Sequence, residues 1–126
     1  MLVLDGHERA VFSVSWGVGQ EGSGTDKGEY LGWLASTGSD GAINVWELSV
    51  GVFDSIWFAL LLMALQEPLE SDSNTPPVHN LIARFPCAHS VYDVNAISWC
   101  PRKGYENILA TVGDDGIVRI WRVLPA

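Results

Sequence analysis

The sequence is short of positive charge. Seven of its 126 residues are lysine or arginine, against fifteen aspartate and glutamate residues, and the formal net charge is −8. Proteins that bind nucleic acids rely largely on Lys and Arg to neutralise phosphates, and no basic cluster occurs along this chain. The composition therefore argues against a nucleic-acid partner.

Cysteine is also scarce. Cys87 and Cys100 form no CxxC pair and lie in no Cys/His cluster, so zinc binding has no support and we expect no metal and no cofactor. The first residues contain no apolar stretch of roughly 7–15 residues behind a basic start, which would mark a secretory signal. We therefore expect a cytoplasmic protein with free thiols, and the nucleus stays open as a second location.

Long apolar runs are missing too. The longest, Ile56 to Leu65, has ten residues, whereas a membrane-spanning helix needs about 20, and Asp54 interrupts its start. A transmembrane helix is thus disfavoured, and we expect no membrane contact.

Two other interpretations of segment 50–66 stay open. The helix formers from Ala59 to Leu65, followed by a stop at Pro68, suit a helical insertion. Alternatively, the codons for Val50-Gly51 can contain a splice donor sequence, and those for Leu65-Gln66 can contain a splice acceptor sequence. The segment can then be a small intron that is retained and translated in frame.

The glycine-rich stretch from Gly17 to Gly32 has no phosphate-binding motif. Neither G-x-x-x-x-G-K-[ST] nor a G-x-G-x-x-G that opens a helix occurs there. We interpret the stretch as a flexible surface loop between strands, and we expect no small-molecule substrate.

The chain does contain an internal repeat. Six residues lie 75 positions before their counterparts: Leu34, Ser36, Gly38, Asp40, Gly41 and Trp46 match Leu109, Thr111, Gly113, Asp115, Gly116 and Trp121. A histidine precedes each copy, in Gly6-His7 and in Ala88-His89. Such self-similarity is the signature of a repeat architecture.

Both copies have the pattern of short β-strands joined by tight turns. Residues 11–16 alternate with the period of two that a half-buried strand shows. Asp40-Gly41 and Asp115-Gly116 are predicted two-residue hairpin turns, because Gly adopts the positive φ that such turns need. Trp16 and Trp99 end matched strands, and we expect both in the core.

A fourth strand is predicted before each histidine. Leu81 to Phe85 takes this place before His89, and Leu2 to Leu4 takes it before His7. All strands are expected to be antiparallel to their neighbours.

These features resemble WD40 repeats. The GH-like dipeptide, the LAS or LAT strand, the DG turn and the terminal Trp occur in this order twice, over residues 2–48 and 81–123. The resemblance implies an all-β chain, a fragment of a WD40 β-propeller with two consecutive blades of the four-stranded type, the last of which lacks its outer strand.

The expected organisation has three parts. Residues 1–48 hold the outer strand of a preceding blade and three strands of a WD40 blade. Residues 49–80 hold the insertion and an acidic, Pro-containing linker. Residues 81–126 hold an outer strand and the C-terminal blade. Because a closed propeller needs four or more blades, the chain is interpreted as the C-terminal fragment of a longer protein or as a truncated gene model.

The WD40 resemblance also implies a hydrogen-bonded structural tetrad in each copy. The matching residues are His7, Ser36, Asp40 and Trp46 in the first copy and His89, Thr111, Asp115 and Trp121 in the second. A His, a Ser and an Asp also suggest a hydrolase triad, but the group recurs in both copies and no nucleophile elbow or oxyanion motif accompanies it. We therefore expect no catalytic residue and no enzyme activity.

The second copy has a narrower resemblance. Asp93-Val94-Asn95, the run from Ser98 to Pro101, and Asp114-Asp115-Gly116 are similar to the last blade of the WD40 proteins of cytosolic iron–sulfur protein assembly. This resemblance implies a non-catalytic scaffold or adaptor in the targeting complex that serves the maturation of extramitochondrial iron–sulfur proteins. Its partners would be the subunits of that complex and apo iron–sulfur proteins. The alternative is a WD40 scaffold of a ubiquitin-ligase, chromatin or trafficking complex.

Overall fold

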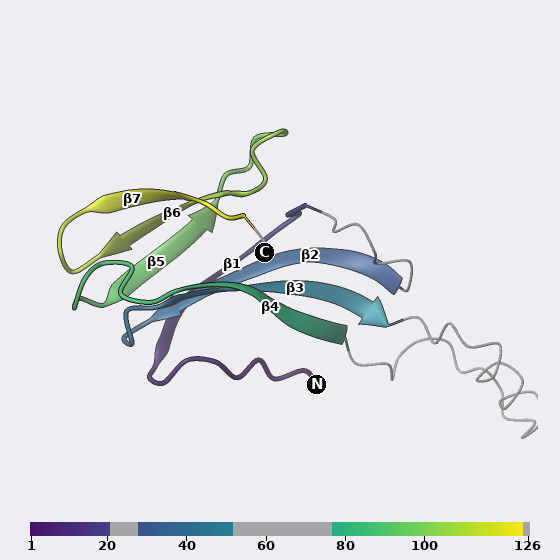
Figure 1. Ribbon diagram of the computed structural model, residues 1–126, viewed down its shortest axis with the longest axis horizontal. Coiled ribbons are helices and arrows are strands. Elements are labelled where there is room, and N and C mark those ends of the chain that lie inside the picture. Colours follow the sequence, from purple (N-terminus) through teal and green to yellow (C-terminus); the bar gives the residue numbers. More distant parts are fainter. Residues whose placement is uncertain (21–27, 52–76, 125–126) are drawn as a thin grey trace, which may run out of the picture.

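The computed structural model describes residues 1–20, 28–51 and 77–124, and these residues form β-strands without a helix. The first sheet contains β1 (Val11–Gly17), β2 (Gly28–Gly38), β3 (Ile43–Gly51) and β4 (Pro77–Phe85). The second sheet contains β5 (Val94–Trp99), β6 (Ile108–Gly113) and β7 (Val118–Arg122). In both sheets the spatial order of the strands follows the chain, and all pairs are antiparallel (Figure 1). The expected all-β class and sheet pattern are confirmed.

The β2–β3 and β6–β7 turns are built alike. Gly41 and Gly116 both have φ of 73°, in the left-handed region where glycine is unstrained. The turns span residues 39–42 and 114–117, so they are longer than the predicted two-residue loops. The reason is that Asp40 Oδ1 accepts the Ala42 N–H at 3.1 Å, which takes the place of a ladder hydrogen bond.

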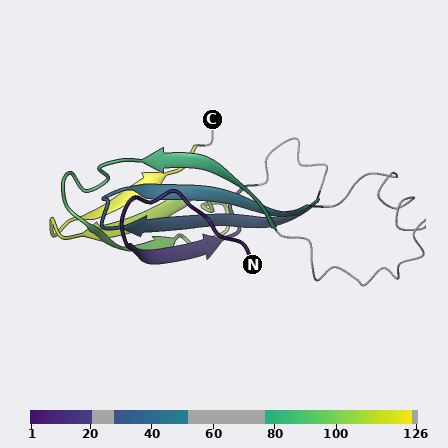
Figure 2. The ribbon, with the colours of Figure 1, turned by 90° about the horizontal axis from the view of Figure 1, so that it is seen from below.

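The two sheets pack face to face through one apolar core. Its buried members come from both sheets: Trp33, Ala35, Ile43, Val45, Ala88, Val94, Ile97, Trp99, Leu109 and Val123. The rings of Trp33 and Trp99 are centred 5.9 Å apart at 51°. Figures 1 and 2 show β5 beside β1, where the two sheets meet. We call this intersheet packing the interblade contact.

Serine side chains fix the register of the interblade contact. Ser13 Oγ accepts the backbone N–H of Ile97 at 3.3 Å, and Ser15 Oγ accepts that of Trp99 at 3.1 Å. The indole N–H of Trp99 also donates to the Ser15 carbonyl at 3.0 Å. The polar residues of the alternating β1 pattern thus face the second sheet. They accept hydrogen bonds from backbone N–H groups on the edge of β5 that does not pair with β6.

The ends of the predicted strands need correction. Residues 2–4 form no strand, because no described strand lies beside them to complete a ladder. Leu81 to Phe85 lies in β4, the fourth strand of the first sheet, and this strand starts earlier than predicted, at Pro77. Similarly, β2 starts at Gly28, so the end of the glycine-rich stretch is strand and not loop.

The proposed insertion begins as a strand and not as a helix. Val50 pairs with Glu29 on one side and with Pro77 on the other, so β3 extends into segment 50–66. Residues 52–66 lie outside the described part of the chain, so the helical insertion and the retained intron are not tested there.

Candidate functional site

A first cluster of hydrogen bonds fixes the N-terminal segment on the first sheet. His7 places Nδ1 2.9 Å from Asp40 Oδ2 and Nε2 2.8 Å from Ser36 Oγ. The indole N–H of Trp46 donates to the same Ser36 Oγ at 3.3 Å. Because Ser36 lies in β2, Asp40 in the following turn and Trp46 in β3, the cluster joins the segment before β1 to the β2–β3 hairpin.

A second cluster repeats this arrangement. His89 Nδ1 lies 2.8 Å from Asp115 Oδ1, and His89 Nε2 lies 2.8 Å from Thr111 Oγ1. The Trp121 indole N–H donates to Thr111 Oγ1 at 2.8 Å. The structure thus brings all eight residues of the expected tetrads together in two groups of four, one in each sheet.

The clusters determine where the histidine protons lie. An indole N–H is only a donor, so Ser36 Oγ accepts from Trp46 and directs its own hydrogen towards His7 Nε2. His7 Nε2 is then the acceptor, and Nδ1–H donates to Asp40. The same order applies to Trp121, Thr111, His89 and Asp115. Each cluster is therefore a chain of donors that ends on a carboxylate.

Hydrogen bonds keep both carboxylates charged. Burial by itself raises the pKa of Asp40, but the N–H groups of Ala42 and Glu8 and the His7 ring donate to it and hold its pKa below the ordinary 3.8. Burial also raises the pKa of Asp115, and hydrogen bonds from His89 and Ile117 together with nearby positive charge lower it below 3.8.

These two pKa values predict acid sensitivity. In the unfolded chain the two carboxyl groups bind protons at higher pH than in the folded chain, so acidification favours unfolding. We expect the free energy of unfolding to fall as the pH decreases from about 5 to about 3, and to vary less with these groups above that range. Urea titrations at a series of pH values measure this directly.

The matched variant is the double substitution Asp40→Asn and Asp115→Asn. It should be less stable at neutral pH and should lose less stability on acidification, with Glu106 as a remaining source of acid sensitivity. Equal losses in the variant and the wild type would show that the two aspartates are not the origin.

The hydroxyl groups of the two clusters are buried, whereas a catalytic nucleophile must be accessible to its substrate. Ser36 is 6% exposed and Thr111 is 1% exposed, and each hydroxyl oxygen already contacts both a histidine and an indole N–H. The Ser–His–Asp distances of the first cluster are those of a catalytic triad, but its hydroxyl is buried inside the sheet.

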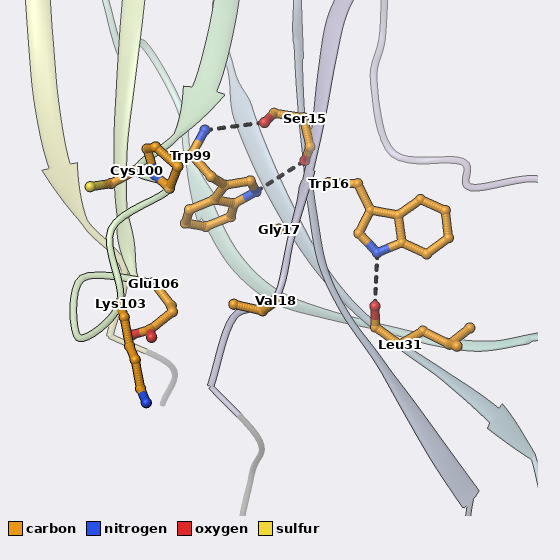
Figure 3. A pocket seen from close by; sticks show the side chains of 10 residues that line it. Ser15, Trp16, Gly17, Val18, Leu31, Trp99, Cys100, Lys103 and Glu106 are labelled. Atoms are coloured by element: carbon orange, nitrogen blue, oxygen red, sulfur yellow. Dashed lines mark hydrogen bonds between the residues drawn. The ribbon is translucent and has the colours of Figure 1, made fainter.

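A separate hollow lies at the ends of β1 and β5, where the two sheets meet (Figure 3). It has a volume of about 590 Å³ and is lined by Ser15, Trp16, Gly17, Val18, Leu31, Trp99, Cys100, Pro101, Lys103 and Glu106. The indoles of Trp16 and Trp99 are among its lining groups, and the Trp16 indole N–H donates to the Leu31 carbonyl at 2.9 Å. None of the eight cluster residues lines it.

Charges of both signs lie at the hollow. Lys103 contributes a positive charge and Glu106 a negative charge. The Glu106 carboxylate accepts the Gly104 N–H at 2.8 Å. This hydrogen bond is the main reason that the pKa of Glu106 is lowered. The hollow is chemically suited to hold an apolar side chain next to a polar or charged group.

The exposure of two tryptophan side chains differs from what the sequence predicted. Trp99 is 8% exposed, as predicted for a core residue, but Trp16 is 61% exposed and that prediction was wrong. Trp33, which the repeat pattern did not assign to the core, is 1% exposed. Trp33 and Ala35 lie on one face of β2, and Leu34 and Ser36 lie on the other. This two-residue period could have indicated that Trp33 is buried.

Metal and membrane features are not seen in the described ranges. Within residues 1–20, 28–51 and 77–124, no three His, Cys, Asp or Glu side chains gather as metal ligands would. Over the same ranges, no helix is long and apolar enough to span a bilayer.

Comparison with protein families gives one match. The family model described as "WD domain, G-beta repeat" matches residues 1–47 and 79–122, which include most of the first sheet, all of the second and both clusters.

Individual relatives are similar to this chain, two of them over nearly its whole length. A protein of Cryptococcus neoformans var. neoformans named "Probable cytosolic iron-sulfur protein assembly protein 1" is 37% identical over 94% of this chain and 26% of its own length. A protein of the same name from Chaetomium globosum is 34% identical over 93% of this chain and 24% of its own. A Nematostella vectensis protein named "Probable cytosolic iron-sulfur protein assembly protein CIAO1 homolog" is 49% identical over 48% of this chain. The chain spans about a quarter of the length of the first two relatives.

Proposed function

The chain belongs to the WD40-repeat family, and from this premise we propose that it is an adaptor in the cytosolic assembly of iron–sulfur proteins. In this role it binds other proteins and holds them in one complex. The iron–sulfur cluster is the cargo of that complex and not a cofactor of this chain.

The observation that carries the proposal is the extent of the similarity. Relatives named for cytosolic iron–sulfur protein assembly match 93–94% of this chain at 34–37% identity, so the match includes both sheets and the interblade contact. A likeness limited to the WD40 motif residues would support only a general scaffold. The narrower role rests on these relatives and the scaffold role on the family.

We further propose that the two clusters are structural tetrads. Each links the segment before a sheet to a hairpin within that sheet, and each occurs once per repeat. A catalytic serine must be reached by its substrate, whereas Ser36 Oγ is buried and hydrogen-bonded twice. A non-catalytic role fits these features.

The same relatives support a cytosolic location. Their names contain the word "cytosolic", and nothing in these names supports the nucleus as a second location. Proteins are the proposed partners, and subunits of an assembly complex and apo iron–sulfur proteins are the specific candidates.

Deletion of the gene that encodes this chain tests the proposal. We expect the iron content of cytosolic iron–sulfur proteins to fall several-fold, while mitochondrial iron–sulfur proteins keep theirs. Radioactive iron incorporated into immunoprecipitated proteins of both compartments measures the effect.

Two complementation strains serve as controls. The wild-type chain should restore cytosolic iron incorporation, and the Trp99→Ala variant, which weakens the interblade contact, should not. Unchanged cytosolic incorporation after deletion would contradict the proposal and would favour another WD40 scaffold, in a ubiquitin-ligase, chromatin or trafficking complex.

A further inference from the structure

The connection between β4 and β5 is one residue longer than its counterpart before β1. Val11 and Val94 are the first residues of β1 and β5, and each pairs with the matched glycine of the next strand. Val11 follows His7 by four positions, whereas Val94 follows His89 by five. The second copy therefore has one extra residue between the cluster histidine and the first strand of the sheet.

The extra residue changes the hydrogen bonds of the connection. In the first copy the residue after the histidine is Glu8, whose N–H donates to Asp40 Oδ2 at 3.1 Å. In the second copy that residue is Ser90, whose N–H donates instead to the Cys87 carbonyl at 3.0 Å. The chain thus forms a turn from Cys87 to Ser90 in place of the hydrogen bond to the carboxylate.

This turn is kept at an energetic cost. Cys87 and Ser90 have φ of 54° and 61°, in the left-handed region that non-glycine residues seldom adopt. Asp115 Oδ2 is buried and accepts no hydrogen bond from the described residues, and Arg119 Nη2 lies 3.6 Å from it. Strained residues of this kind cluster at functional sites, so we expect the turn to serve a function beyond the packing of the two sheets.

The turn exposes two apolar side chains. Val91 is 88% exposed and Tyr92 is 48% exposed. The corresponding loop before β1 has the polar Glu8 and Arg9 next to its histidine. We call residues 90–93 the β4–β5 tip. Both sheets beside the tip belong to this chain, and Figures 1 and 2 show the tip at the end of the sheets where the β2–β3 and β6–β7 turns lie.

Backbone contacts hold the β4–β5 tip in place. The Tyr92 N–H donates to the His89 carbonyl at 3.1 Å, and the Asp114 N–H donates to the Asp93 carbonyl at 3.1 Å. The β2–β3 turn supports the tip, because a Cβ added to Gly41 would lie 3.2 Å from the Tyr92 carbonyl oxygen. A side chain presented from a fixed backbone loses less conformational entropy when a partner binds. The tip is therefore preorganised for binding.

The charges that adjoin the two apolar side chains are negative. Asp93 is the last residue of the tip, and Asp114 is exposed beside it, with its carboxylate accepting the Asn95 amide N–H at 2.7 Å. The guanidinium of Arg119 lies 3.6 Å from Asp115, so its charge offsets that of Asp115. A partner that has lysine or arginine next to an apolar side chain complements both the apolar and the acidic part of this surface.

We propose that the β4–β5 tip docks a protein segment in which an apolar side chain stands next to lysine or arginine. The apolar side chain packs on Val91 and Tyr92, and the basic side chain lies against the carboxylates of Asp93 and Asp114. Tyrosine is among the residues that contribute most to the affinity of protein interfaces. This docking site rests on the proposed function, because an adaptor binds other proteins, and it specifies where one of them binds.

Selection from a displayed peptide library tests the docking site on the full chain. Random short peptides on phage are first depleted on the double variant Val91→Ser and Tyr92→Ser, and the rest are selected on the wild type. The depletion removes peptides that bind any other exposed surface, so the remaining binders recognise the tip. We expect these binders to share an aromatic or aliphatic residue next to a lysine or arginine.

A synthetic peptide of the most enriched sequence measures what each side chain contributes. Fluorescence anisotropy gives its affinity for the wild type and for the single variants Val91→Ser and Tyr92→Ser. We expect each variant to weaken binding by about fivefold or more, the effect of losing a side chain that contributes to an interface. Both side chains are exposed, so circular dichroism should show an unchanged sheet content.

Tyr105→Ser is the matched control. Tyr105 has the same exposed fraction as Tyr92, 48%, but it lies in the connection between β5 and β6. Its replacement should leave the affinity for the peptide unchanged. Equal losses for Tyr105→Ser and Tyr92→Ser would show that the peptide does not recognise the tip.

The double variant Asp93→Asn and Asp114→Asn tests the charge of the docking site. It preserves the shape of both side chains and removes their negative charge. We expect the affinity of the wild type for the peptide to decrease with added salt, because ions screen the attraction between exposed charges. The double variant should bind more weakly at low salt and should respond less to added salt.

Three results would overturn the docking site. They are no enrichment after depletion, a selected peptide that binds Tyr92→Ser as tightly as the wild type, and selected peptides with acidic residues in place of basic ones. These assays contain no iron–sulfur protein, so such a result leaves the adaptor role to the gene-deletion experiment. Conversely, normal cytosolic iron incorporation after deletion would reject the adaptor role while the peptide affinities stand.

Discussion

Replacement of Trp99 with alanine is expected to lower the free energy of unfolding by about 3–5 kcal/mol, the usual range for a buried Trp. Trp99 contacts Trp33 across the interblade contact, and its indole N–H donates to Ser15. The substitution removes this packing and the hydrogen bond from the indole N–H to the Ser15 carbonyl. Since small domains are stable by about 5–15 kcal/mol in total, this loss removes a large share of the stability of the chain.

Trp16→Ala is the matched control, because Trp16 occupies the same position in the other repeat. It is 61% exposed, so its loss should cost less than about 1 kcal/mol. Urea denaturation followed by circular dichroism measures both variants. Equal losses would show that the second sheet is not held by its packing on the first.

The second large effect is expected for His89→Ala. The side chain is 0% exposed and lies between Thr111 and Asp115. We expect a loss of about 3 kcal/mol from the cavity and the broken hydrogen bond to Thr111. The charge on Asp115 also loses its principal donor, which acts in the same direction.

His79→Ala is the control for loss of a histidine. His79 is exposed on β4 and lies edge-on to the Trp46 ring, with ring centroids 5.9 Å apart. Its replacement should change the stability by less than about 0.5 kcal/mol. Thermal unfolding of both variants gives the comparison, and a His89→Ala chain as stable as His79→Ala would rule out a structural role for the second cluster.

The strand pattern was predictable because it depends on short-range chemistry. The alternation along β1 and the positive φ at Gly41 and Gly116 are properties of a few adjacent residues. Repetition at one offset then made the assignment stronger than either copy alone. The length of the turns was missed because it depends on side-chain hydrogen bonds such as that of Asp40.

Exposure was less predictable because it depends on what lies next to each sheet. Trp16 and Trp99 occupy the same repeat position, yet only Trp99 has a described sheet against its face. Residues 2–4 have strand-like composition but no described strand to pair with. The hollow at the ends of β1 and β5 is formed by two segments far apart in the chain, so no local motif marks it.

The cluster residues were found through resemblance and not through local pattern. His7 and Asp40 are 33 positions apart, and His89 and Asp115 are 26 apart. No periodicity of a strand connects such residues. Their recurrence relative to the Trp at the end of each copy is what singled them out, and the same recurrence in space places one cluster in each sheet.

The pairing of β3 with β4 bears on how this fold tolerates changes in length. The two strands run together from Ile43 and Phe85 to Val50 and Pro77, with one register shift between Val45 and Trp46, so the ends of the connection between them are held side by side by the ladder. The entropy of closing a loop grows only with the logarithm of its length. Evolution can therefore lengthen, shorten or replace the connection after Val50 at small thermodynamic cost, and selection on its length is free to follow function.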